Sequence, residues 1–112
     1  QRWLARTGDT ALLGATITAA PGLVRTRDDL LDPAGWTTAA ARLRQSYGLR
    51  WELEVDEPIA GLVAACDGCT PLSFAVAILA ASLGAGVGEV ADGVIPVVRD
   101  LIGRGFLLPP DL

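Results

Sequence analysis

The chain has 112 residues, of which 51% are hydrophobic and 20% are charged, and it carries a formal net charge of −4. These values exclude a disordered chain and a multidomain enzyme, because they describe one domain with a modest core, shorter than most cofactor-dependent enzyme folds. The charge is uneven along the chain: residues 1–50 carry seven arginines and four acids, whereas residues 51–112 carry two arginines and nine acids. The excess of acids argues against a polyanionic partner for the second half.

The chain begins at Gln1 and contains no methionine, so we expect a single domain, residues 1–112, cut from a longer protein. No segment approaches the roughly 20 apolar residues that cross a bilayer. No signal peptide is visible either, and we expect a cytoplasmic protein.

Residues 1–55 are predicted to form mainly strands. Residues 13–18 alternate apolar with small or polar side chains, which is the period of a strand. Residues 32–35, Asp-Pro-Ala-Gly, supply a side-chain acceptor, a fixed φ and freedom for positive φ, as a turn requires. We therefore predict a β-hairpin from about residue 23 to residue 44. The strongest strand pattern is LRWELEV, residues 49–55, with its charges facing water.

The period becomes helical from Asp56, which is placed to cap a helix whose first turn contains Pro58. Four apolar residues at helical spacing predict the buried face of this helix: Ile59, Leu62, Val63 and Cys66. A second helix is predicted from Thr70, as its cap, to Gly84, as its end. Its predicted core side consists of Leu72, Val76, Leu79 and Leu83.

A third helix is predicted from about residue 88 to residue 102, and Gly93 and Pro96 are placed to kink or split it. Its predicted inward side chains are Val90, Val94, Val97 and Leu101. Residues 105–109 predict an apolar final strand. The predicted fold is therefore α+β: an N-terminal antiparallel hairpin or small sheet, then a winged-helix-like unit of three helices with a C-terminal wing strand over residues 56–112.

Cys66 and Cys69 are the only cysteines and stand as C-x-x-C. A zinc site needs four ligands, and a chain without histidine has only these two thiolates to offer, so we predict no metal site. A redox pair normally opens a helix after a strand, whereas Cys66 closes a predicted helix. We therefore predict a buried thiol and a turn cysteine, and a thiol redox module that uses Cys66 and Cys69 is kept as an alternative.

The sequence GAGVG at residues 84–88 has the glycine spacing of nucleotide-binding loops, but such loops follow a buried strand, and this one follows a predicted helix. We predict no cofactor-binding residue in it. No catalytic residue is predicted either, because the neighbouring acids have no histidine beside them and the serines have no triad partners. These acids are Glu52, Glu54 and Asp56, and these serines are Ser46, Ser73 and Ser82.

Three helices followed by a strand also suggest a winged-helix regulator that binds nucleic acid, and we keep this as a second alternative. In the predicted third helix, Arg99 is the only basic residue that could contact nucleic acid, and the same helix carries three acids. A basic surface would have to come from the hairpin arginines, which are Arg25, Arg27, Arg42 and Arg44.

A family resemblance covers about residues 9–109. The stretches that carry it are LRQSYGLRWELEVDEPIAGLVAACDGCTPLSFAVAILAASLG and VIPVVRDLIGRGFLLP, and its most specific parts are ELEVD, LVAACDG and VVRDLIGRGFL. They resemble the C-terminal domain that follows the catalytic domain in a family of bacterial class I S-adenosylmethionine-dependent methyltransferases. That family commonly has another residue where Cys69 stands.

The resemblance implies that the parent chain is a methyltransferase that holds S-adenosylmethionine through residues upstream of Gln1. This chain is then expected to be a non-catalytic accessory domain without a cofactor of its own. It would dock a peptide or protein substrate, or stabilise the upstream methyltransferase domain or a dimer. We expect the docking site in a groove between the third helix and an exposed strand edge, because an edge offers unpaired backbone groups to an extended segment.

Overall fold

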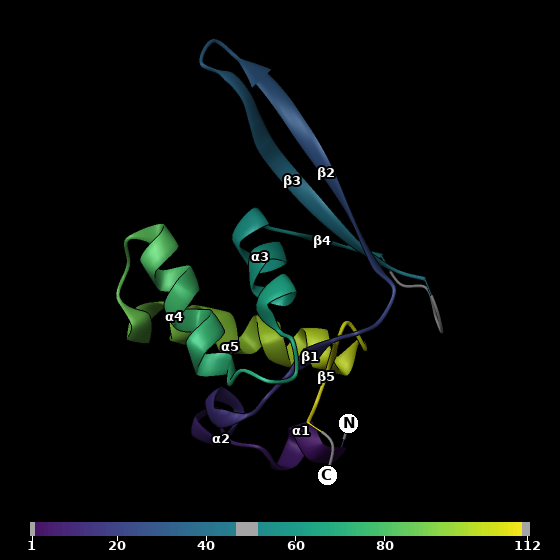
Figure 1. The fold of residues 1–112 in the computed structure, drawn as a ribbon, viewed down its shortest axis with the longest axis vertical. Coiled ribbons are helices and arrows are strands. Elements are labelled where there is room, and N and C mark those ends of the chain that lie inside the picture. The colour runs from purple at the N-terminus through teal and green to yellow at the C-terminus, as the bar shows by residue number, and fades with distance from the viewer. Residues whose placement is uncertain (1, 47–51, 111–112) are drawn as a thin grey trace.

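The computed structural model of the chain describes residues 2–46 and 52–110. Within these ranges the fold is α+β, as predicted, with two small antiparallel sheets and five helices (Figure 1). The elements in chain order are α1 (Arg2–Arg6), α2 (Asp9–Gly14), β1 (Thr18–Ala19), β2 (Leu23–Asp32), β3 (Gly35–Gln45), β4 (Glu52–Val55), α3 (Glu57–Ala65), α4 (Leu72–Leu83), α5 (Val87–Gly103) and β5 (Leu107–Leu108).

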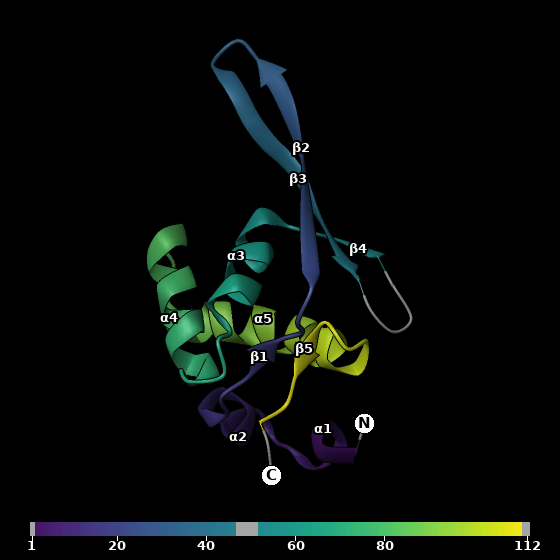
Figure 2. The ribbon, with the colours of Figure 1, turned by 45° about the vertical axis from the view of Figure 1, so that its right-hand side comes forward.

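The predicted hairpin is confirmed and is formed by β2 and β3, which pair along their whole length. Its turn has the predicted chemistry: the Ala34 N–H donates to Asp32 Oδ1 at 2.8 Å, and Gly35 has a φ of 121°. β4 pairs only with residues 41–44 of β3. The outer part of the hairpin is therefore a two-stranded arm, which projects away from the helices in both views (Figures 1 and 2).

The core lies between the helices and the small β1–β5 sheet. Eight large side chains are almost completely buried there: Phe106, Leu12, Ile17, Leu72, Leu101, Leu107, Val76 and Val98. Burying each such side chain stabilises the fold by roughly 1.5–3 kcal/mol. Most of the predicted core sides of the helices are confirmed, because the following predicted side chains are buried: Leu62, Val63, Cys66, Leu72, Val76, Leu79, Val94 and Leu101. α5 is also a single helix that runs through Gly93 and Pro96, so of the predicted kink or split the split does not occur.

Several local predictions are wrong. Residues 13 and 14 belong to α2, and the strand is confined to Thr18 and Ala19, because a short helix followed by extended residues gives the same alternation as a strand. Leu83 is 53% exposed, since α4 ends there and turns away from the core. Asp56 is the N-cap residue of α3, as predicted, but its side chain makes no cap bond. The N-cap residue of α4 is Pro71 rather than Thr70.

The segment from residue 15 to residue 20 connects three parts of the chain. On one side the Ala19 N–H donates to the Cys66 carbonyl at 2.8 Å, and the Gly68 N–H donates to the Ile17 carbonyl at 3.1 Å. On the other side β1 pairs with β5, which is the predicted final strand. Gly68 has a φ of 80°, and a Cβ on it would collide with the Thr18 hydroxyl oxygen. The close approach of the two segments therefore requires glycine at position 68.

We predict that Gly68→Ala lowers the free energy of unfolding by about 2 kcal/mol or more, because it combines a positive φ with a steric collision. Urea denaturation followed by circular dichroism measures this. Gly93→Ala is the matched control: Gly93 lies inside α5 with open space at its Cβ position. It should stabilise the protein by about 0.5–1 kcal/mol. Equal effects at the two positions would contradict the role assigned to Gly68.

Candidate functional site

A groove lies between β4 and α5. The sequence predicts a groove beside the third helix and an exposed strand edge, without indicating which strand. The observed groove has a volume of about 510 Å³. Apolar side chains line most of it: Leu53, Val55, Ile59, Pro96 and Val97. Three acids complete its lining: Glu54, Asp56 and Asp100. We call this site the edge groove.

One wall of the edge groove is a strand edge. β4 is the last strand of the three-stranded sheet, whose order is β2-β3-β4, and it pairs with β3 on one side. No other strand in the described ranges pairs with its second side. Leu53 and Val55 are partly buried, whereas Glu52 and Glu54 are exposed, as the alternation predicted. Residues 49–51 of the predicted strand lie outside the described residues.

The acids of the edge groove differ in their partners. Arg104 lies one helical turn after Asp100, and its Nε donates to both oxygens of the Asp100 carboxylate at 3.0 Å. No described residue forms an ion pair or a side-chain hydrogen bond with Glu54 or Asp56. These two residues are two positions apart, so their side chains leave the chain on the same side. The site therefore presents negative charge beside an apolar floor.

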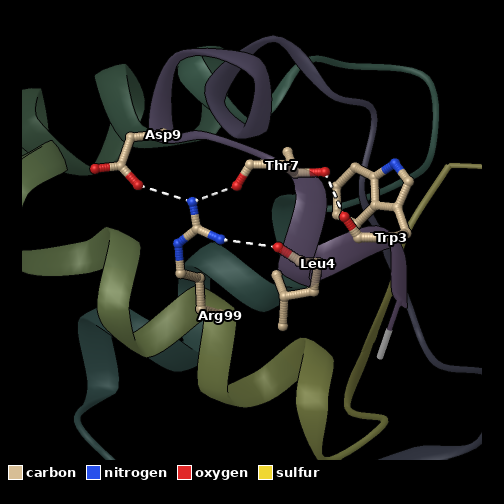
Figure 3. A network of polar contacts seen from close by, with 5 residues as sticks. All are labelled: Trp3, Leu4, Thr7, Asp9 and Arg99. Carbon is tan, nitrogen blue, oxygen red and sulfur yellow. Dashed lines mark hydrogen bonds and ion pairs between the residues drawn. The ribbon is translucent and has the colours of Figure 1, made fainter.

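Arg99, on α5, holds the N-terminal helices in place (Figure 3). Its guanidinium donates to the Leu4 carbonyl at 3.3 Å, the Thr7 carbonyl at 2.7 Å and the Asp9 carboxylate at 2.8 Å. The Thr7 hydroxyl in turn donates to the Trp3 carbonyl. Sequence reasoning weighed Arg99 only as a contact for nucleic acid and missed this role, because its partners lie more than 85 residues away in the chain.

The hairpin arginines do not form a separate basic surface. Arg25 lies 3.8 Å from Glu57, Arg27 lies 3.9 Å from Asp29, and Arg42 lies between Asp28 and Glu52 at 3.6 and 3.7 Å. Acids therefore balance three of the four arginines at close range. The arrangement is unfavourable for binding a phosphate backbone, which needs cations that can exchange their counterions for phosphates.

The two cysteines occupy the environments that the sequence predicted. Cys66 is buried at the end of α3, and its thiol donates to the Leu62 carbonyl at 3.3 Å. Burial, assisted by the neighbouring Asp67 carboxylate, raises the pKa of the Cys66 thiol from 9.0 to about 11. Cys69 is exposed in the turn, and both thiols are free. A thiol held in its protonated form is a poor nucleophile, which is unfavourable for redox exchange near neutral pH.

The turn after Cys66 is ordered by Asp67. Its Oδ1 accepts the backbone N–H groups of Cys69 and Thr70 at 2.9 and 3.0 Å, and these bonds lower the pKa of the Asp67 carboxyl. The Thr70 hydroxyl also donates to the Asp67 carboxylate, at 3.4 Å. Because Thr70 is bound to Asp67 in this turn, it does not cap α4.

The GAGVG sequence links α4 to α5. Gly84 ends α4 in the left-handed conformation, with a φ of 67°, and Gly86 is the N-cap residue of α5. The loop therefore follows a helix, as predicted, and lacks the preceding strand that a nucleotide-binding loop requires.

Across the described residues, no three acids or cysteines gather closely enough to hold a metal ion. Among the same residues, no single helix has the length and apolar character to cross a membrane.

The fold and the edge groove define a small α+β domain with a surface site beside an exposed strand. Residues 1–109 match the family described as "Domain of unknown function (DUF7782)". This match covers nearly the whole chain, and the chain therefore belongs to the DUF7782 family. No curated protein matches the chain.

We predict that the Cys66 thiol makes stability fall at alkaline pH. The pKa of this thiol is about 11 in the folded protein against an ordinary value of 9.0. The contribution of the thiol to the free energy of unfolding is therefore complete below pH 9.0 and is lost as the pH rises towards 11. The expected loss of unfolding free energy is about 2–3 kcal/mol. Urea denaturation at a series of pH values measures this slope. Cys66→Ala should remove the slope and Cys69→Ser should leave it unchanged; a slope that persists in Cys66→Ala would point to another group.

Proposed function

We propose that the chain is a docking domain that holds an extended peptide segment of a partner protein in the edge groove. The observation that carries this proposal is the position of an apolar, acid-rimmed groove directly beside the free side of β4. A strand edge supplies backbone donors and acceptors for an added strand, and pockets beside it select alternate side chains of the incoming segment.

The groove also indicates the chemistry of the segment. Leu53 and Val55 offer apolar contact, whereas Glu54 and Asp56 offer negative charge that no described residue balances. Side chains of an added strand alternate between its two faces. The segment that fits therefore alternates apolar with basic residues, and its charge complements the excess of acids in the second half of the chain.

The family resemblance connects this site to an activity. Two of its most specific parts, ELEVD and VVRDLIGRGFL, contribute β4 and, on α5, the groove-lining residues Val97 and Asp100. The proposal is accordingly that the partner is the methyl acceptor of a cytoplasmic S-adenosylmethionine-dependent methyltransferase, to which this chain belongs as a non-catalytic accessory domain. Nothing in the arrangement favours the two alternatives, because three of the four hairpin arginines lie beside acids and Cys66 is buried and protonated.

We predict that the isolated chain does not bind S-adenosylmethionine. Isothermal titration and amide chemical shifts should show no response, because the GAGVG loop follows α4 rather than a strand. Saturable binding with shifts centred on residues 84–88 would reverse our interpretation of that loop and remove the accessory role.

We predict that a blocked heptapeptide of alternating arginine and valine binds the edge groove. Titration into ¹⁵N-labelled protein should shift the amide signals of residues 52–56 and 97–100. A peptide with glutamate in place of arginine should not bind. The same basic peptide with methylated backbone nitrogens should bind weakly, because it cannot donate to the strand edge.

The charge part of this prediction is tested by the double variant Glu54→Gln/Asp56→Asn, which should weaken peptide binding about three- to tenfold. The matched control is Glu89→Gln/Asp92→Asn, which removes the same charge from exposed positions of α5 outside the groove lining. This control variant should bind the peptide with an affinity within about twofold of that of the unaltered protein. Added salt should weaken peptide binding to the unaltered protein. The proposal fails if both double variants act equally, or if the shifts lie on the arm or on α4.

A further inference from the structure

The outer side of α4 is apolar and exposed. Phe74 and Ile78 lie one turn apart on this side and are 58% and 52% exposed. Ala77 and Ala81 lie beside them, and we call these four residues the α4 face. The other sides of α4 pack against α2, α3 and α5, and α4 lies at the outer edge of the molecule in both views (Figures 1 and 2). A helix that is apolar on all sides is normally covered on all sides.

The absence of charge around the α4 face limits what can cover it. No charged residue occurs between Asp67 and Glu89, although the chain as a whole carries −4. A second copy that packed on α5 or on the edge groove would set exposed acids against their own counterparts, and like charges in contact are costly. The α4 face can meet its own copy without this cost. It also lacks the arginines and lysines by which helices attach to anionic lipid surfaces.

We propose that two copies of the chain pair through their α4 faces, with the two helices antiparallel about a two-fold axis near Ile78. In such an interface each Ile78 lies against Ile78 of the second copy. Phe74 precedes Ile78 by one turn, so it lies against the residue one turn after Ile78 in the second copy, which is Ser82. The small side chains of Ala77 and Ala81 allow the helices to approach closely.

A second groove supports this arrangement. It lies between α3 and α4, has a volume of about 290 Å³, and is lined by Pro58, Gly61, Ala65, Ile78 and Ser82 among others. An antiparallel pair brings Phe74 of each copy to the Ser82 end of this groove, which offers room for its ring. Glu57 is the charged residue in the lining. Its Oε1 lies 3.8 Å from Arg25, whereas its Oε2 is buried without a hydrogen-bond partner among the described residues.

The pair should be weak, because a single helix from each copy buries less than the roughly 1,200 Å² of a stable interface. We expect a dissociation constant of about 100 µM, measured by sedimentation equilibrium from about 10 µM to about 1 mM. Added salt should strengthen the association, because it screens the repulsion between two copies of charge −4. This sign is opposite to that expected for peptide binding in the edge groove, so the two proposals can fail independently.

The decisive experiment uses charge at the two-fold axis. Ile78→Glu and Ile78→Lys should each be monomeric, because each sets like charges against one another. An equimolar mixture of the two variants should associate again, since glutamate then meets lysine. Circular dichroism checks that both variants are folded. Leu30→Glu is the matched control, because Leu30 is a 58% exposed leucine on the arm; it should associate like the unaltered protein.

Three results would overturn the proposal. The first is a protein that stays monomeric up to about 1 mM at high salt. The second is association that Leu30→Glu abolishes and Ile78→Glu does not, which would place the interface on the arm. The third is a mixture of folded Ile78→Glu and Ile78→Lys that stays monomeric, which would show that Ile78 does not meet its own counterpart.

Discussion

The fold depends on the backbone hydrogen bonds of residues 15–20. This short segment accepts a bond from the Leu72 N–H at the start of α4, exchanges bonds with the turn at Cys66 and Gly68, and receives β5 on its other side. It therefore fixes where α3 ends, where α4 begins and where the chain leaves α5. Both proposed surfaces follow from these constraints, because the edge groove needs the position of α5 and the α4 face needs the direction of α4.

Arginine pairing determines which surfaces remain available for partners. Arg99 is used to hold the N-terminal helices, Arg104 neutralises Asp100, and Arg42 lies between two acids of the sheet. Much of the positive charge is thus satisfied within the fold, whereas Glu54 and Asp56 have no described partner. The described residues thus present an acidic groove and an uncharged apolar face, and such surfaces select different partners.

Patterns with a local cause were predictable from the sequence. The turn at residues 32–35 and the helical period after Asp56 were predicted, since each depends on neighbouring residues or on simple alternation, whereas the expected groove beside the third helix was not assigned to a particular strand. The role of Arg99 was not predictable, because its partners lie at the other end of the chain. α1 and α2 were missed because helices of five and six residues hold too few apolar positions to show a period. Leu83 matched the helical period, but the helix ends at that residue.

The two proposed surfaces are compatible with one another. The α4 face and the edge groove share no residue, and β4 lies on the other side of α3 from α4 in both views (Figures 1 and 2). Pairing through α4 would therefore leave both edge grooves open at the two ends of the dimer. A partner with two basic segments would then bind the second groove at a high effective concentration, so that a weak groove and a weak dimer would strengthen one another. Because a ligand that binds the dimer preferentially also stabilises it, docking and pairing would be thermodynamically coupled.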